Sequence, residues 1–271
     1  MTRLAIIIVS FNAKDDLANA LRSLTDGAPA TSHEIVVVDN ASTDGAAEMV
    51  RDRFPRVRVI DAGGNVGFAR ANNLGIRSTG SELALLLNPD TVVPPRAIDR
   101  LVARLDERPD AAVIGPRIVD ARGTPELSFG AALTPWREIR RKAIDRFDKH
   151  GLAVARRAIA QATSREANVD WVTGACLLAR RADLEAAGLF DERYFLYVED
   201  VDLCAAIRAN GRTIVFSPVA EIVHLRGRSG LATSGAASLA WHQSHLAYYR
   251  KHLPGWAPWL ERYLRMKGLA P

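Results

Sequence analysis

An acidic residue stands directly after an apolar run in the first half of the chain. Leu83–Leu87 reads LALLL, and the next three residues are Asn-Pro-Asp, ending at Asp90. A carboxylate here is a candidate ligand for Mg²⁺ or Mn²⁺, which take one or two protein carboxylates and fill their other positions with phosphate oxygens and water. The alternative is that Asp90 caps a helix expected to begin near Pro95. The residues alone leave both interpretations open.

A second acidic cluster lies in the sequence FDERYFLYVEDVDLC, residues 190–204. Glu199 and Asp200 come shortly after the aromatic residues Phe195 and Tyr197, so we expect these carboxylates in a partly apolar setting. Such a setting raises the pKa of a carboxyl group and suits it to general-base chemistry. A charged first turn of a helix, which the helix dipole favours, explains the same residues equally well.

His224 is the third candidate, in the sequence AEIVHLRGRS. A single histidine after an apolar strand is usually structural. Here Arg226, Arg228 and Ser229 follow it, and such groups suit phosphate contact. Imidazole combined with carboxylate also favours Mn²⁺-type ions over Ca²⁺.

The elements that would position these residues alternate between strand-like and helix-like segments. Apolar runs predict strands at 4–10, 34–39, 57–61, 83–87 and 112–115, and helical spacing predicts helices at 15–24, 42–54, 68–77 and 96–108. This rhythm predicts an α/β fold with an open, mostly parallel sheet covered by helices. Ligands bind beyond the carboxyl ends of such strands, where four polar or glycine-rich segments follow: 10–12, 39–42, 63–67 and 88–90.

The regular alternation stops at residue 116. The rest predicts a loop or hairpin at 117–129, a basic helical region at 136–165, strand at 168–179, a helix at 199–209, a strand at 213–217 and a helical tail at 241–266. The basic residues between Arg137 and Arg157 could contact a membrane or form a solvated face.

Composition narrows the function classes. The 271 residues are 48% hydrophobic with a net charge of +5, which fits one large α/β domain, with or without a smaller appendage, and an anionic ligand. Neither a G-x-G-x-x-G fingerprint nor a P-loop motif occurs, which disfavours dinucleotide oxidoreductases and P-loop enzymes. Cys176 and Cys204 form no metal or disulfide pattern, so a reducing compartment is expected. No apolar run approaches the ~18 residues that cross a bilayer.

Six stretches, in order, resemble the inverting family 2 glycosyltransferases with the GT-A fold, and in particular the bacterial rhamnosyltransferase-like enzymes of cell-envelope polysaccharide synthesis. They are IIIVSFNAKDDLANALRSL, IVVVDNASTDG, NVGFARANNLGI, LLLNPDTVV, VTGACLLARRADLEAAGLFDERYFLYVEDVDLC and HLRGRS. The resemblance implies a GT-A domain over residues 1–230, with a nucleotide-sugar-binding half (1–116) and an acceptor and catalytic half (117–230). A helical C-terminal extension would occupy 231–271.

The resemblance also implies a role for each matching residue. Asp200 would be the catalytic base, and Asp90 and His224 would hold a divalent metal, Mn²⁺ or Mg²⁺. The residues that would bind the donor are Ser10, Asp39, Asn65, Gly67, Arg70, Asn88 and Arg228, with the Asp39 carboxylate accepting the pyrimidine N3–H. The residues on the acceptor side would be Trp171, Gly174, Ala175 and Glu199, with the Trp171 ring facing a sugar. Asn88 departs from the family's Asp-x-Asp motif, so a ribose or metal contact there is less firmly implied.

The implied reaction is the transfer of L-rhamnose from dTDP-rhamnose to a lipid-linked or polysaccharide acceptor, with inversion. A UDP-hexose donor remains an alternative, and a nucleotide-sugar-binding protein without catalysis is a weaker one. A sugar-1-phosphate nucleotidyltransferase would need a glycine-rich basic loop after the first strand, which residues 10–13 do not provide. No Gln-x-x-Arg-Trp motif occurs, which disfavours a processive synthase.

The tail after residue 230 combines aromatic and basic residues, and no nucleic-acid partner is expected. Its aromatic residues are Tyr248, Tyr249, Trp256, Trp259 and Tyr263, and its basic residues include Arg250, Lys251, Arg262, Arg265 and Lys267. Such a mixture suits a membrane interface, and packing of the aromatic rings on the core explains it equally well. The expected location is cytoplasmic, with peripheral contact at the inner face of the membrane.

Overall fold

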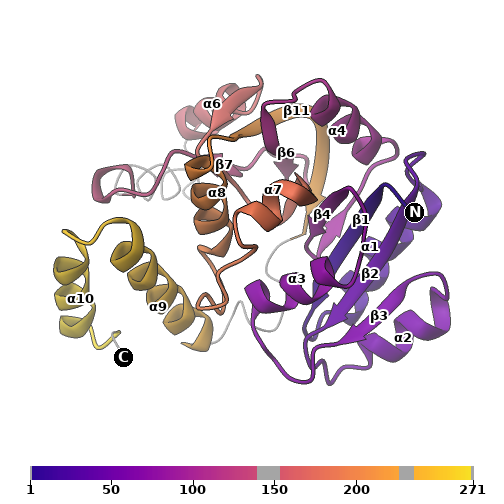
Figure 1. Cartoon of the computed structure of the whole chain (residues 1–271), viewed down its shortest axis with the longest axis horizontal. Helices are drawn as coiled ribbons and strands as arrows, with labels where there is room; N and C mark the ends of the chain where they lie inside the picture. The colour runs from indigo at the N-terminus through magenta and orange to yellow at the C-terminus, as the bar shows by residue number, and fades with distance from the viewer. Residues whose placement is uncertain (1, 139–152, 226–234, 270–271) are drawn as a thin grey trace.

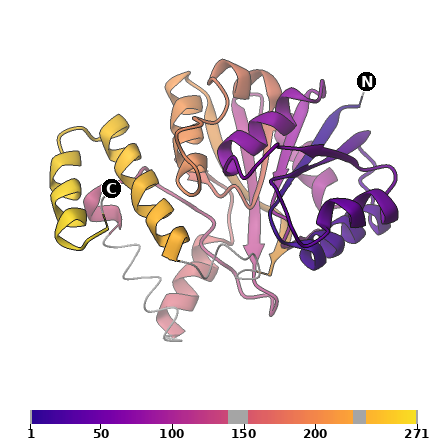
Figure 2. The ribbon, with the colours of Figure 1, turned by 90° about the horizontal axis from the view of Figure 1, so that it is seen from below.

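The computed structural model describes residues 2–138, 153–225 and 235–269. Within them, a mixed sheet of nine strands runs through the molecule, with helices on both faces (Figures 1 and 2). The strand order is β3-β2-β1-β4-β10-β6-β11-β5, and β8 pairs with β11. The expected α/β fold with a helical C-terminal extension is therefore confirmed.

The N-terminal part of the sheet is parallel. Its strands are β1 (Leu4–Ser10), β2 (His33–Asp39), β3 (Arg58–Asp61) and β4 (Leu83–Leu87). All residues of β1 and β4 are buried, because helices cover both faces. This explains why both strands read as unbroken apolar runs.

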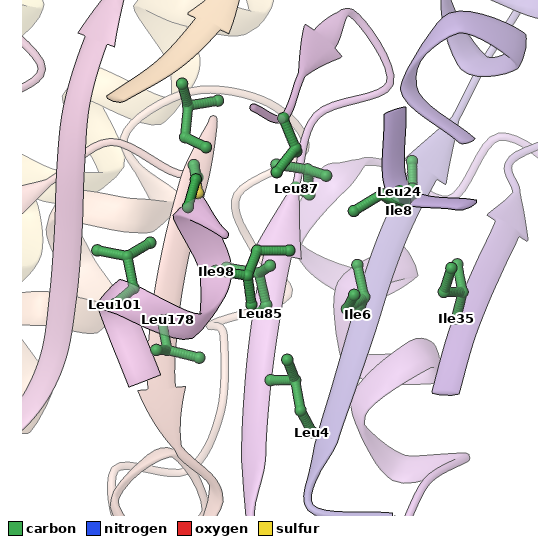
Figure 3. Close-up of a cluster of buried hydrophobic side chains, with 14 of the residues drawn as sticks. Leu4, Ile6, Ile8, Leu24, Ile35, Leu85, Leu87, Ile98, Leu101 and Leu178 are labelled. Atoms are coloured by element: carbon green, nitrogen blue, oxygen red, sulfur yellow. The ribbon is translucent and has the colours of Figure 1, made fainter. Parts of the chain in front are cut away.

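Alternate residues of β1 pack into two hydrophobic layers. Leu4, Ile6 and Ile8 meet α1 (Lys14–Asp26), α2 (Ala46–Arg53) and α4 (Ala97–Asp106), and Figure 3 shows part of this layer. On the other face, Ala5, Ile7 and Val9 belong to the layer formed with α3 (Phe68–Arg77), α7 (Arg181–Ala186) and α8 (Glu199–Ala209). The helix predicted at 42–54 begins only at Ala46, because residues 42–44 form polar contacts with the loop after β1.

The other strands of the sheet pair in both parallel and antiparallel directions. β10 (Cys176–Arg180) lies antiparallel between β4 and β6 (Ala111–Val119). β6 runs parallel to β11 (Thr213–His224), which also pairs antiparallel with β5 (Thr91–Val92) and β8 (Ala167–Val169). The single strand predicted at 168–179 is thus divided into β8, β9 (Trp171–Val172) and β10. β9 pairs with β7 (Phe129–Gly130) in a separate two-stranded sheet.

The C-terminal tail forms two helices, α9 (Gly235–His252) and α10 (Ala257–Met266), separated at Pro254. They lie at the end of the molecule opposite the N-terminus (Figures 1 and 2). Of the basic region predicted at 136–165, the structure describes residues 136–138, α6 (Ala153–Ala162) and its surroundings, and 139–152 lie outside the described residues. No helix in the described ranges is long and apolar enough to cross a membrane.

Both cysteines are buried and free. Burial in the apolar core raises the pKa of the Cys176 and Cys204 thiols to about 12, so both stay protonated near neutral pH.

Candidate active site

A cavity of ≈450 Å³ opens at the carboxyl ends of the parallel strands. Its wall includes residues from the end of β1, from the loops before α3 and after β4, from residues 173–175 and 195–200, and His224. The three groups of candidate residues, which lie far apart in the sequence, therefore meet at one cavity. This is the convergence that an open parallel sheet predicts.

Asp90 and His224 form a buried pair in this wall. β5 follows Asp90, and its pairing with the end of β11 sets His224 opposite Thr91. His224 Nε2 lies 3.1 Å from Asp90 Oδ1 and 3.5 Å from Asn88 Nδ2, and the Asp90 and His224 residues are 6% and 9% exposed. The side chain of Asp90 does not cap α4, which begins at Ala97 without a side-chain cap. Helix capping is therefore not the role of Asp90.

The same pair fits a divalent cation. One carboxylate and one imidazole nitrogen face each other, and the adjoining cavity leaves room for phosphate oxygens and water as further ligands. No cluster of three or more His, Cys, Asp or Glu side chains with metal-binding geometry occurs among the described residues. A metal at Asp90 and His224 would thus depend on substrate oxygens to complete its coordination.

Ser10 and Asp39 occupy paired positions at the ends of β1 and β2. Both are buried, and Ser10 Oγ and Asp39 Oδ1 have no hydrogen-bond partner in the part of the chain that the structure describes. Burial raises the pKa of Asp39, which hydrogen bonds from Ser42 partly oppose. Two buried, unsatisfied oxygens at a strand end are costly in an empty site, which suits groups that receive donors from a ligand.

Asn65 and Gly67 both line the cavity. Asn65 Oδ1 accepts a hydrogen bond from Asn40 Nδ2 at 2.9 Å, and Asn40 Oδ1 accepts from Val66 N at 2.8 Å. The two side-chain amides therefore hold the loop before α3. Asn40 was not predicted, although it directly follows Asp39 in the sequence DNAS.

Gly67 is required where it stands. Its φ is +84°, and an added Cβ would lie 2.6 Å from Phe195 O and 2.8 Å from Phe195 Cδ2. Next to it, Phe68 N donates to Phe195 O at 2.7 Å. The start of α3 and the segment before α8 are thus packed directly against each other.

Asp200 lies in the first turn of α8, and its carboxylate is held by backbone groups. Gly174 N donates to Asp200 Oδ2 at 2.8 Å, and Val201 N donates to Oδ1 at 2.8 Å. Both residues 174 and 200 line the cavity. The carboxylate is therefore oriented by the loop between β9 and β10, which also carries Ala175.

Glu199, the neighbour of Asp200, is 6% exposed. Burial raises the pKa of Glu199 well above its ordinary value, and repulsion from Asp200 raises it further. Tyr197 and Val198 precede it with φ of +70° and +69°. A left-handed conformation is unfavourable for a β-branched residue such as Val198, and strain of this kind is often stored at functional sites.

The cavity wall is tied to the C-terminal helices through two sets of contacts. Ser244 Oγ donates to Leu196 O at 2.8 Å, which fixes the segment beside the cavity. In α8, Asp202 is 1% exposed, and its carboxylate accepts a hydrogen bond from Lys251 Nζ at 2.8 Å. The other partners of Asp202 are His252 Nε2 at 2.6 Å and Tyr194 Oη at 3.1 Å.

Four predicted residues are not among those that line the cavity: Ser10, Asp39, Arg70 and Trp171. Trp171 is 4% exposed, its Nε1 donates to Ala131 O at 3.0 Å, and its ring covers Gly130. This buried ring offers no face to a sugar, so the interpretation of Trp171 as a stacking residue is not supported by its position. Arg70 is exposed and faces Glu192 at 3.8 Å. Arg228 lies outside the described residues.

The aromatic rings that do reach the cavity are Phe195 and Tyr197. They are 40% and 37% exposed, and both line the wall. The buried Tyr194 and Val198 flank this segment, which turns two aromatic side chains outward. Both rings lie in the sequence FLYVED, directly before the predicted acidic residues, whereas residue type alone pointed to Trp171 as the sugar-binding ring.

Comparison with known proteins identifies the family of the chain. Residues 5–162 match the family described as "Glycosyl transferase family 2". The N-acetylglucosaminyl-diphospho-decaprenol L-rhamnosyltransferase of Mycobacterium tuberculosis is 30% identical over 275 residues, which cover 93% of this chain and 86% of that protein.

Solved structures show the same fold. GalNAc-T7 with UDP, GalNAc and Mn²⁺ has a TM-score of 0.65 at 16% identity, covering 91% of this chain and 48% of that one. The mannosyltransferase PcManGT from Pyrobaculum calidifontis, in complex with GDP-Man and Mn²⁺, has a TM-score of 0.62 at 19% identity, covering 96% and 68%. The GT-A fold predicted from the sequence is confirmed. The chain belongs to glycosyl transferase family 2 and is a rhamnosyltransferase-like glycosyltransferase.

Proposed function

We propose that the protein transfers L-rhamnose from dTDP-rhamnose, with inversion and with a divalent metal, to a lipid-linked or polysaccharide acceptor of the cell envelope. One observation carries the proposal: Asp200, held by two backbone N–H groups, lines the same cavity as the Asp90–His224 pair. The rhamnosyltransferase named above supports the choice of sugar and of a lipid-linked acceptor.

The donor would occupy the N-terminal half, residues 1–116. The unpartnered Asp39 Oδ1 fits the N3–H of a thymine or uracil base, and Ser10 Oγ lies at the paired position of the neighbouring strand. Asn65 and Gly67 would border the nucleotide, and Asn88 would border the diphosphate. Because thymine and uracil present the same N3–H, these contacts do not distinguish a dTDP-sugar from a UDP-sugar.

Asp90 and His224 would hold Mn²⁺ or Mg²⁺. When bound, the metal would offset the negative charge of the leaving nucleoside diphosphate. The basic residues after His224, Arg228 among them, are proposed to contact the same phosphates.

Asp200 would act as the general base. It takes the proton of the acceptor hydroxyl as that oxygen forms a bond to the anomeric carbon. The bond from the anomeric carbon to the diphosphate oxygen breaks on the opposite side, and the nucleoside diphosphate leaves with the electron pair. One base is enough, since a single displacement inverts the anomeric centre without a covalent enzyme intermediate.

The acceptor would enter from the second half of the domain, residues 117–230. Gly174 and Ala175 border the cavity beside Asp200. The outward rings of Phe195 and Tyr197 take the place proposed earlier for Trp171, because they present exposed aromatic faces at the cavity.

A lipid-linked acceptor requires the enzyme at the membrane surface. The structure separates the aromatic residues of the tail, since Tyr248 and Tyr249 of α9 are 3% and 4% exposed and pack in the core. On α10, by contrast, Trp259, Tyr263 and Met266 are 69%, 51% and 71% exposed at helical spacing. We propose that this α10 face, with the basic residues beside it, contacts the inner face of the cytoplasmic membrane.

The testing experiment measures nucleotide release from a panel of dTDP-, UDP- and GDP-sugars with Mn²⁺ or Mg²⁺ and without acceptor. EDTA-sensitive release from dTDP-rhamnose is expected. Selective release from a UDP-sugar would keep the mechanism and replace the donor. No release from any donor, together with no metal-dependent nucleotide binding, would overturn the proposed function.

A further inference from the structure

Glu199 is a buried carboxyl group for which the mechanism above has no use. It lines the cavity as the first residue of α8 and is 6% exposed. No described residue lies within hydrogen-bond distance of its Oε2. A buried polar atom without a partner is costly, so we expect its partner to enter with the substrate.

The charge of Glu199 follows from its neighbour. The Asp200 carboxylate accepts hydrogen bonds from Gly174 N and Val201 N, which favour its ionised form. A second negative charge beside it, in a poorly solvated wall, is unfavourable. Burial and the charge of Asp200 both raise the pKa of Glu199, so the proton of the pair belongs on Glu199.

Among the described residues, Tyr197 is a second titratable group that interacts with Glu199. Burial raises the pKa of the Tyr197 phenol, and the neighbouring Glu199 raises it further, so the phenol is also neutral at pH 7. Asp200 is therefore the anion of this part of the wall. A protonated carboxyl group offers an O–H donor as well as an acceptor oxygen.

Glu199 keeps its position although the backbone directly before it is strained. Tyr197 and Val198, directly before it, both have positive φ, and α8 starts without a side-chain cap. The contacts from Ser244 Oγ to Leu196 O and from Phe68 N to Phe195 O hold this segment in place. The fold thus maintains a strained segment that delivers a buried acid to the cavity.

We propose that Glu199 is a neutral hydrogen-bond donor to an oxygen of the acceptor sugar, beside the hydroxyl that Asp200 deprotonates. The proton stays on Glu199 throughout the reaction. This inference rests on the proposed function for the identity of the substrate. A donor of this kind discriminates strongly between acceptors, because a buried donor left without its partner is costly.

Three variants test the role of Glu199 in the transfer reaction. Glu199→Gln keeps an N–H donor and cannot ionise, so we expect the transfer rate to fall by no more than about threefold. Glu199→Leu keeps the volume without a donor, and we expect acceptor kcat/KM to fall about 10- to 100-fold, mainly through KM. Asp200→Asn is the reference for loss of the base, expected at about 10²–10⁴-fold in kcat.

Two results would overturn the inference. If Glu199→Gln is as inactive as Asp200→Asn, Glu199 works as an anion. If Glu199→Leu transfers as fast as the unchanged protein, Glu199 does not contact the acceptor. Should Glu199→Leu fail to fold, the comparison of Glu199→Gln with Asp200→Asn still decides between an anion and a neutral donor.

An infrared measurement separates this inference from the proposed function. A carbonyl-stretch band of a protonated carboxyl group is expected at pH 7 in the unchanged protein and should be missing in Glu199→Gln. The band does not depend on turnover, so its absence overturns the neutral state of Glu199 even if the donor assignment holds. If the band is present while no nucleotide is released from any donor, the proposed function fails and the neutral state of Glu199 stands.

Discussion

Replacing Gly67 by alanine tests the packing between α3 and the segment before α8. The matched control is Gly63→Ala, because Gly63 has φ +74° with no atom within 4 Å of an added Cβ, whereas at Gly67 (φ +84°) the Cβ would lie 2.6 Å from Phe195 O. Both variants carry the cost of an alanine at positive φ, about 1–3 kcal/mol. The variant at residue 67 adds the contact with Phe195, and its ψ of 167° lies in a region that almost only glycine adopts.

The expected magnitude follows from two further costs at residue 67. Overpacking against Phe195 costs about 1–3 kcal/mol. Displacing Phe195 O weakens its hydrogen bond from Phe68 N, which is worth about 0.5–1.5 kcal/mol. Gly67→Ala should therefore lose about 2.5–7.5 kcal/mol of unfolding free energy, against about 1–3 kcal/mol for Gly63→Ala.

Urea denaturation followed by tryptophan fluorescence measures both free energies, and nucleotide release measures the site. Gly67→Ala should lower release at least tenfold, because the displaced segment carries Glu199 and leads to Asp200. Equal stability of the two alanine variants would refute the packing of α3 against Phe195. Full release from a destabilised Gly67→Ala would show that the segment can shift without disturbing the catalytic residues.

Four further predictions concern single side chains. Asp90→Asn should lower Mn²⁺ affinity, measured by calorimetry with the nucleotide present, and nucleotide release by at least tenfold. Asp202→Asn removes a buried carboxylate that accepts from Lys251, His252 and Tyr194, and it should cost about 1–3 kcal/mol of unfolding free energy in urea, because Lys251 is partly exposed and keeps its contact with Asp191. Hydrogen bonds from Arg104 lower the pKa of Glu166 to about 2. The ionised Glu166 therefore stabilises the fold fully above about pH 4.5, and this contribution is lost as the pH falls towards 2. Glu166→Gln should remove up to about 3 kcal/mol of this acid-dependent loss of stability. Trp259→Glu should weaken sedimentation with vesicles containing anionic lipid, while Val219→Glu, at an exposed site outside α10, should not.

Each of these predictions has a contradicting result. Unchanged metal affinity in Asp90→Asn would remove Asp90 from the metal site. An unchanged stability of Asp202→Asn would show that the contacts of Asp202 do not hold the tail in place. An equal loss of stability in acid for Glu166→Gln and the unchanged protein would assign the effect to other carboxylates. Equal vesicle binding by both glutamate variants would exclude the α10 face as the membrane contact.

Local patterns predicted the elements that single segments determine. The strand Leu83–Leu87 and the helices α3 and α8 have the predicted bounds, because the strand is an unbroken apolar run, the helices have helical spacing, and turn residues enclose them. Asp90 could be placed at a strand end for the same reason. Its proximity to His224 was implied by the family resemblance and not by local patterns, since it depends on the antiparallel pairing of β5 with β11 across about 130 residues.

Side-chain exposure was the least predictable property of the site. Trp171 suggested a sugar-binding face by its residue type, but Gly130 leaves room for its indole and draws it into the core. Phe195 and Tyr197 were treated as surroundings of the acidic residues, and they face outward instead. Tyr248 and Trp259 belong to the same aromatic tail, yet only the packing of α9 against the core distinguishes them.

The ion pairs of Asp202 have a consequence for exchanging parts between related enzymes. The C-terminal helices contribute Lys251 and His252, while the GT-A domain contributes Asp202 and Tyr194. A tail transplanted from a relative would bring its own residues to a buried carboxylate that here accepts hydrogen bonds from Lys251 and His252. Chimeras that exchange the last two helices should therefore keep their activity only when both sides of this ionic junction are exchanged together.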